Sequence, residues 1–233
     1  MARLLPTVLV LVLLAGTAAA FAVTERLKLE PAPLAVGQGV RVFSPVCGCE
    51  TRRAELPVRV RAAGRLSVEI VRDDGETVRE LLDRRVPAGR VLVAWDGRDE
   101  AGRVAPEGIY RPRVTLGAGR TFLLPTPLRL DVTPPPLTLV SARPRVLRRA
   151  GYYRYRRLVV RYRLGERARL TLHVGERARV GGRVVRRGGG HLDWWGRIDG
   201  RPAPPGRYAV TLVAVDVAGN RSQAGPVTVR VRP

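Results

Sequence analysis

One motif occurs twice in this chain and constrains its fold more than any other feature. The first copy, at 102–110, reads G-R-V-A-P-E-G-I-Y, and the second, at 200–208, reads G-R-P-A-P-P-G-R-Y. A tryptophan precedes each copy by a few residues. A repeat at domain-sized spacing indicates duplication of a folded module, whereas a solenoid repeats at shorter intervals. We therefore expect two copies of one domain.

The residue types of the motif predict a structural role. Proline fixes φ, glycine permits a tight reversal, and the aromatic rings bury large areas at strand ends. With Gly102 aligned to Gly200, Trp195 matches Trp95 if the second copy has lost two residues, and Trp194 matches it if the second copy has lost one. Trp195 is taken here as the counterpart. The motif residues expected to hold the fold are Trp95, Asp96, Gly97, Gly102, Pro106, Gly108, Tyr110, Trp195, Gly200, Pro204, Gly206 and Tyr208.

The remaining pattern is that of short β-strands. Runs of alternating or clustered apolar residues, such as those at 66–71 and 170–174, are separated by Gly, Pro and Asp turn signals. Each half has about the strand number of a seven-stranded sandwich of roughly 100 residues. The predicted fold class is all-β, with two tandem immunoglobulin-like β-sandwiches preceded by one N-terminal transmembrane or signal helix.

Three consecutive prolines at 134–136 mark the boundary between the halves, because they hold an extended chain and supply no strand donors. The predicted organisation is a signal anchor or signal peptide at 1–23, a spacer at 24–41 with room for one strand, a first immunoglobulin-like domain at 42–132, a proline-rich linker at 133–136 and a second immunoglobulin-like domain at 137–233.

The N-terminal segment differs in composition from the rest of the chain. Residues 4–23 carry no charge, and as a helix they would extend about 30 Å, which is enough for a bilayer core. The small residues at 18–20 fit a cleaved signal peptide, whereas the length of the apolar run favours an uncleaved anchor. We expect a single-pass membrane protein with its C-terminal domains outside the cytoplasm, or alternatively a secreted protein.

Cys47 and Cys49 are the only cysteines, and an exported chain can oxidise them to a disulfide. Pairing within so short a ring would strain the bond and make it reducible, so a redox or intermolecular role stays open beside a structural one. No metal site is expected, since zinc needs four ligands and the two histidines, His173 and His191, lie far from the cysteines in sequence.

The segment WDGRDEAGRVAPEGIYRPRV, together with the strand and turn pattern before it, resembles the FlgD-type immunoglobulin-like domain, which is named for the bacterial flagellar hook-capping protein. The resemblance covers residues 57–132 and is degenerate in the second half, where D-V-A-G-N at 216–220 is similar to a hairpin of bacterial surface repeats. The resemblance implies a β-sandwich used for assembly or adhesion, and it implies no catalytic residues.

The net charge of +22 is carried almost entirely by arginine. A GC-rich genome and selection for arginine chemistry both explain this bias, and in either case the charge attracts polyanions in a salt-dependent manner. Arginines and tyrosines interleave densely at 143–163, where tyrosine adds stacking surface to arginine charge. The candidate residues for anion or polymer binding are Arg148, Arg149, Tyr152, Tyr153, Arg154, Tyr155, Arg156 and Arg157; the alternative is a solvated strand face with tyrosines in the core.

No catalytic constellation is recognisable, and no cofactor is expected. The carboxylates Asp96, Asp99 and Glu100 could form a cation or catalytic cluster, but an Asp-Gly turn and neighbouring arginines account for them. The glycine clusters at 181–182 and 188–190 could cradle an anion, although a mobile hairpin is the simpler interpretation.

The sequence therefore predicts a non-enzymatic, extracytoplasmic binding or scaffolding protein of the bacterial envelope, with a protein or an anionic cell-wall polymer as partner. Two alternatives remain: a structural subunit of a flagellum-like or other surface appendage, and a DNA-binding protein of the cell surface.

Overall fold

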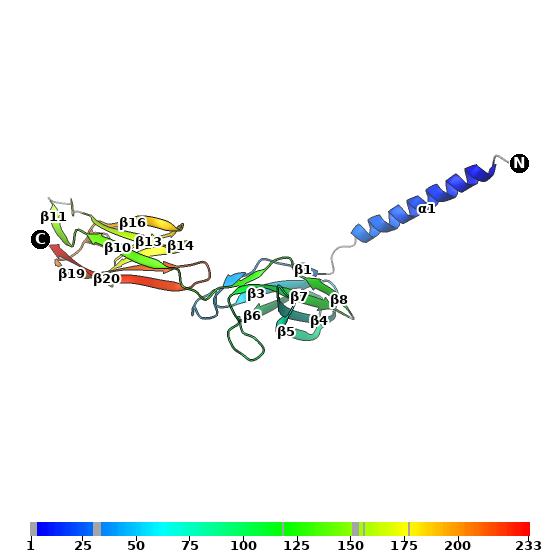
Figure 1. Ribbon diagram of the computed structural model, residues 1–233, viewed down its shortest axis with the longest axis horizontal. Helices are drawn as coiled ribbons and strands as arrows, with labels where there is room; N and C mark the ends of the chain where they lie inside the picture. The colour runs from blue at the N-terminus through cyan, green and yellow to red at the C-terminus, as the bar shows by residue number, and fades with distance from the viewer. Residues whose placement is uncertain (1–3, 30–33, 118, 151–153, 156, 177) are drawn as a thin grey trace.

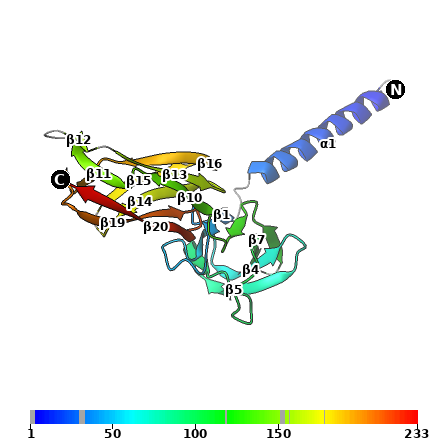
Figure 2. The same cartoon turned by 60° about the vertical axis from the view of Figure 1, so that its left-hand side comes forward.

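The computed structural model describes residues 4–29, 34–117, 119–150, 154–155, 157–176 and 178–233. Two β-sandwiches follow one another along the long axis of the molecule, and the two termini lie at opposite ends (Figure 1). The turned view in Figure 2 again shows two separate sandwiches. The predicted all-β class is confirmed.

The first sandwich has one three-stranded sheet in the order β1-β3-β6 and a second sheet in the order β2-β9-β7-β4-β5, with β8 paired to β7. Its strands are β1 (Leu34–Val36), β2 (Val42–Phe43), β3 (Ala54–Val60), β4 (Gly64–Arg72), β5 (Thr77–Val86), β6 (Gly89–Trp95), β7 (Gly108–Leu116), β8 (Arg120–Leu123) and β9 (Leu128–Leu130). The segment expected to be a spacer contains β1, which pairs with β3 and so belongs to this domain.

The second sandwich has a three-stranded sheet in the order β10-β13-β16 and a six-stranded sheet in the order β12-β11-β20-β19-β14-β15, beside a small β17-β18 hairpin. Its strands are β10 (Leu137–Arg143), β11 (Val146–Ala150), β12 (Arg154–Tyr155), β13 (Leu158–Leu164), β14 (Ala168–Val174), β15 (Ala178–Val185), β16 (Gly188–Trp194), β17 (Arg197–Ile198), β18 (Arg201–Pro202), β19 (Gly206–Val215) and β20 (Arg221–Arg232).

The two sandwiches share one topology. The order β1-β3-β6 corresponds to β10-β13-β16, and β2-β9-β7-β4-β5 corresponds to β11-β20-β19-β14-β15. The unusual parallel pair recurs as well, since β2 runs parallel to β9 and β11 runs parallel to β20. Such detailed agreement extends the duplication from the short motif to the whole domain.

Each sandwich closes over its own apolar core, because the strands alternate buried and exposed side chains with the period of two that a β-strand imposes. In β13 the buried residues Leu158, Val160, Tyr162 and Leu164 alternate with more exposed ones. The largest fully buried side chains are Trp95 in the first core and Trp194 in the second. With so few aromatic residues, these two tryptophans are the main large anchors of the cores.

In the described part of the chain one helix, α1 (Leu4–Leu29), precedes the sandwiches and continues past the expected end of the apolar segment at Val23. Of the residues that the structure places, none forms a helix with both the length and the apolar character that a membrane crossing requires. The transmembrane span expected at 1–23 is therefore not supported.

Candidate functional site

The first copy of the repeated motif is a self-contained set of hydrogen bonds. The indole nitrogen of Trp95 donates to the Arg98 carbonyl at 2.9 Å, and the Tyr110 hydroxyl donates to the Pro106 carbonyl at 2.6 Å. The two rings pack edge to face with centroids 4.8 Å apart. These aromatic polar groups are bonded internally, and the motif links the end of β6 to the start of β7.

The second copy repeats these bonds through Trp194. Its indole nitrogen donates to the Arg197 carbonyl at 2.8 Å, and the Tyr208 hydroxyl donates to the Pro204 carbonyl at 2.7 Å. Trp195, which the sequence alignment chose as the motif tryptophan, is 57% exposed. The structural counterpart of Trp95 is thus Trp194, because the inward-facing position falls one residue earlier at the end of β16.

The carboxylates of the first motif serve the turn. An oxygen of Asp96 accepts the Arg98 amide, and Asp99 accepts the amide and guanidinium of Arg103. Desolvation favours a raised pKa for Asp99, but the hydrogen bonds and charge of Arg103 outweigh it and hold the pKa below its ordinary value. Glu100 accepts the backbone amide of Glu80. These three residues are therefore occupied by local structure.

Cys47 and Cys49 form a disulfide in the loop between β2 and β3. The loop is folded on itself, since the Cys49 amide lies 3.2 Å from the Cys47 sulfur and the Cys49 sulfur lies 3.1 Å from the Thr51 hydroxyl. The disulfide thus shapes a compact protrusion at the end of the first sandwich.

This protrusion contacts the second sandwich. The Thr51 hydroxyl donates a 2.7 Å hydrogen bond to the Ala218 carbonyl, and Ala218 is fully buried. A β-carbon on Gly219 would collide with the Cys49 sulfur and the Thr51 hydroxyl, so only glycine allows this approach. The disulfide loop and the turn between β19 and β20 consequently pack as one interface.

The D-V-A-G-N turn is rigid on its own side of that interface. One Asp216 oxygen accepts the amides of Gly219 and Asn220 at 2.7 and 2.9 Å, and the other accepts the Asn220 side chain at 2.9 Å. The same Asn220 amide group also donates to the Asp131 carbonyl at 2.9 Å. Asn220 therefore joins the second sandwich to the last residues of the first.

The proline linker is bound at both ends. Glu107 accepts the Val132 amide at 2.6 Å and the Thr133 hydroxyl at 2.7 Å, and these bonds hold its pKa below the ordinary value. At the other end the Gly165 amide donates to the Pro136 carbonyl at 2.7 Å. The residues that form the junction are Cys47, Cys49, Thr51, Glu107, Asp131, Pro136, Gly165, Asp216, Ala218, Gly219 and Asn220, and we call this set the interdomain junction.

A pocket of about 490 Å³ beside the junction is lined in part by Asp131, Glu166 and Asp216. Desolvation raises the pKa of Glu166, and the negative charges of Asp216 and Asp131 raise it further. Among the residues that the structure describes, no group of three or more His, Cys, Asp or Glu side chains could hold a metal ion. The acidic residues here belong to the packing of the junction.

The predicted anion-binding stretch is only partly visible. Arg148 is exposed on β11, whereas the Arg157 guanidinium pairs with Asp193 at 2.9 Å and lies 5.8 Å from the Trp195 ring centre. Tyr152, Tyr153 and Arg156, and the side chains of Arg149, Arg154 and Tyr155, lie outside the described part of the chain.

The glycine clusters do not form one hairpin. Gly181 and Gly182 lie at a bulge in β15, which pairs with β14, while Gly190 lies in β16, which pairs with β13 of the opposite sheet. A β-carbon on Gly190 would meet the ring of Tyr162. Gly181 and Gly190 therefore permit close packing within the sandwich, whereas Gly188 has open space around it. Sequence reasoning missed these contacts because they lie across strands.

The shared topology and the repeated bond set define a tandem immunoglobulin-like β-sandwich protein. Residues 53–119, which lie within the first sandwich, match the FlgD Ig-like domain. The second sandwich has the same strand order but lies beyond the matched residues.

Several solved structures are similar to this chain at low identity. Fibronectin(III)-like modules of Clostridium thermocellum CbhA cover 85% of this chain and 92% of their own at 16% identity and a TM-score of 0.41. FlgD from P. aeruginosa covers 56% of this chain and 84% of its own at 19% identity and a TM-score of 0.30. A solved chain from a structural study of a 1.5-MDa bacterial ice-binding adhesin matches over 85% of this chain and 63% of its own length, at 16% identity and a TM-score of 0.34. No curated protein matches the sequence.

Proposed function

We propose that this chain is a non-enzymatic structural protein of the bacterial cell surface, which holds two immunoglobulin-like sandwiches in a fixed arrangement and presents them to an envelope protein or an anionic glycopolymer. The interdomain junction carries this proposal. Domains joined by a flexible linker move independently by default, yet here side chains of both domains bond across the boundary and both ends of the linker are bonded.

The junction is built for rigidity in three ways. Proline residues limit the linker to extended conformations. Hydrogen bonds from Thr51 and Asn220 cross between the domains. The buried polar groups Asp216 and Asn220 are bonded to each other, which specifies one orientation of the turn. A stiff two-domain unit suits a spacer or scaffold, because it transmits position from one end to the other.

The non-enzymatic assignment rests on the residues singled out as candidates for chemistry. Asp96 and Asp99 support a turn, and Cys47 and Cys49 are joined in a disulfide at the junction. FlgD-type domains are non-catalytic folds, which agrees with a structural role for the first sandwich.

A second candidate function is a structural subunit of a surface appendage, which the FlgD Ig-like match at 53–119 favours. Such a subunit would co-purify with sheared filaments, whereas an envelope scaffold would remain with the cell body. Recovery in one fraction or the other discriminates the two.

The surface location is tested by protease digestion of intact cells that produce the full chain with a C-terminal epitope tag. We expect loss of the tag under conditions in which a cytoplasmic marker survives. If the tag resists digestion in intact cells and is lost only after permeabilisation, together with the cytoplasmic marker, the surface role is wrong.

A further inference from the structure

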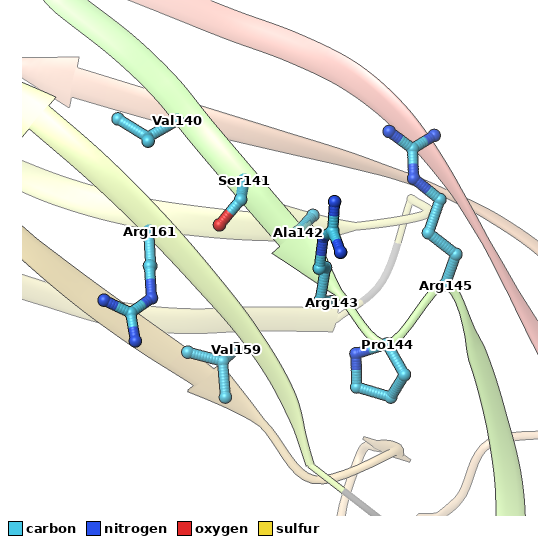
Figure 3. Close-up of a pocket in the computed structure, with 8 residues that line it drawn as sticks. All are labelled: Val140, Ser141, Ala142, Arg143, Pro144, Arg145, Val159 and Arg161. Atoms are coloured by element: carbon cyan, nitrogen blue, oxygen red, sulfur yellow. The ribbon is translucent and has the colours of Figure 1, made fainter.

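A basic pocket of about 850 Å³ opens on the outer face of the sheet β10-β13-β16. Its lining combines three arginines with a hydroxyl and small apolar side chains (Figure 3). The lining residues are Val140, Ser141, Ala142, Arg143, Pro144, Arg145, Val159 and Arg161. We propose that this pocket binds a phosphate group of an anionic, phosphodiester-linked glycopolymer, which deepens the proposed surface function and rests on it.

The backbone brings the arginines together. Strand pairing sets Ser141 opposite Arg161 and Arg143 opposite Val159, so Arg143 and Arg161 lie on neighbouring strands near the same end of the sheet. Pro144 then turns the chain out of β10, and Arg145 follows it before β11 begins. In Figure 3 the Val159 side chain lies beside Arg161, whose guanidinium points away from those of Arg143 and Arg145, so the lining places an aliphatic group beside the charged ones.

The three guanidinium groups are uncompensated. Within the described residues, the side chains of Arg143, Arg145 and Arg161 have no ion pair or hydrogen bond, and all three residues are exposed. The lining holds no carboxylate. Asp193, which pairs with Val159 across the sheet, is held by Arg157 at 2.9 Å. The pocket lining therefore carries three positive charges without a negative partner, and an anion bound there gains their attraction.

The chemistry of the lining selects among polyanions. A guanidinium fork donates two parallel hydrogen bonds to a phosphate or carboxylate, and Ser141 adds a hydroxyl. Sites for single-stranded nucleic acid stack bases on aromatic rings, but none of the lining residues is aromatic. Val140, which is 60% exposed, and Val159 instead offer aliphatic contact to a sugar or polyol. The pocket therefore favours a phosphodiester-linked glycopolymer over nucleic acid.

The test compares two triple variants of the full chain that lose the same charge. R143Q/R145Q/R161Q removes the pocket cations, and the control R84Q/R85Q/R90Q removes three exposed arginines of the first sandwich. The probes are purified poly(glycerol phosphate), a single-stranded DNA of equal phosphate number and inorganic phosphate, each titrated at several salt concentrations.

We expect the pocket variant to bind poly(glycerol phosphate) about tenfold or more weakly than the control variant does at the same salt concentration. Weak competition by inorganic phosphate would show that the ligand is the polymer rather than a free ion. Complete competition at equal phosphate concentration would show that a free ion suffices and would overturn the proposed polymer ligand. Equal losses in both variants, or tighter binding of DNA than of poly(glycerol phosphate), would also overturn the proposal.

A third variant, R143K/R145K/R161K, separates charge from geometry. Lysine keeps the point charge but lacks the planar fork, so we expect it to restore only part of the lost affinity. Circular dichroism and thermal unfolding show whether the variants remain folded. These binding measurements are independent of the cell-surface experiment, so failure of the pocket and failure of the proposed location are distinguished.

Discussion

The Thr51 hydroxyl of the first sandwich donates a 2.7 Å hydrogen bond to the Ala218 carbonyl of the second. The bond joins residues that are 167 positions apart in sequence. It lies at the centre of the interdomain junction, where the disulfide loop meets the D-V-A-G-N turn. Several predictions about the rigidity of the molecule depend on this contact and its neighbours.

Substitution of Thr51 by valine removes the hydrogen bond with little change in shape. We expect the junction to lose about 1 kcal/mol and the distribution of interdomain distances, measured by small-angle X-ray scattering, to broaden. Thr138→Val changes an exposed threonine of the second sandwich and serves as the control. An unchanged distribution in Thr51→Val would show that this hydrogen bond does not fix the arrangement of the two domains.

Gly219→Ala should open the junction, because the new β-carbon would collide with the Cys49 sulfur. Gly219 and Gly200 both have positive φ, at 97° and 76°, so alanine costs about 1 kcal/mol of backbone strain at either site. Of these two glycines, Gly200 is the one with open space where the new β-carbon would lie. We expect scattering to change in Gly219→Ala and to stay as in the wild type in Gly200→Ala.

The double variant Cys47→Ser/Cys49→Ser separates local packing from domain stability. Closure of so short a loop removes little entropy from the unfolded chain, so the denaturation midpoint of the first sandwich should hardly move. The loop that packs on Gly219 loses its shape, however, and the interdomain distances should spread. Reduction of the wild type should reproduce this effect, whereas the variant should not respond to the reductant.

Trp194→Ala and Trp195→Ala adjoin in sequence but should differ widely in cost. Trp194 is 1% exposed and anchors the second core, so its truncation should destabilise that sandwich by about 3–5 kcal/mol. Trp195 is exposed and contacts Arg157, so its loss should cost less than about 1 kcal/mol. Chemical denaturation checks both values, and similar costs would refute the reassignment of the motif tryptophan.

Glu166→Gln should raise the thermal unfolding temperature at neutral pH. Because the pKa of Glu166 is raised in the folded state, its protonation favours folding. The associated stability is fully present below the ordinary pKa of 4.5 and is lost as pH rises through the raised pKa. The difference between variant and wild type should therefore vanish in acid and grow toward neutrality. Glu176→Gln, which changes an exposed carboxylate of the same sandwich, serves as the control.

Much of the fold could be predicted from local sequence. Alternating apolar residues predicted strands such as β13 and β14, and the paired motifs pointed to a duplicated module. The motif tryptophan was misplaced because Trp194 and Trp195 are chemically identical in sequence. Which ring enters the core depends on which face of the sheet each residue points to at the end of β16.

The candidate sites were harder to predict, since they depend on contacts between distant segments. Cys47 and Cys49 suggested a disulfide, but no local signal indicates that it would pack against Gly219. Arg143, Arg145 and Arg161 were part of the basic stretch, yet their grouping around one pocket follows from the pairing of β10 with β13.

The sequence by itself determined the class of each domain, because strand periodicity, turn residues and a paired Trp and Tyr motif are local properties of the chain. The tertiary structure decided how the two domains are joined and where the unpaired charges gather. The hydrogen bond of Thr51 to Ala218 and the presence of three arginines in one pocket lining both require a folded backbone. Sheet register and domain packing bring these residues together. Register and packing depend on the whole fold and cannot be read from residues that are neighbours in sequence.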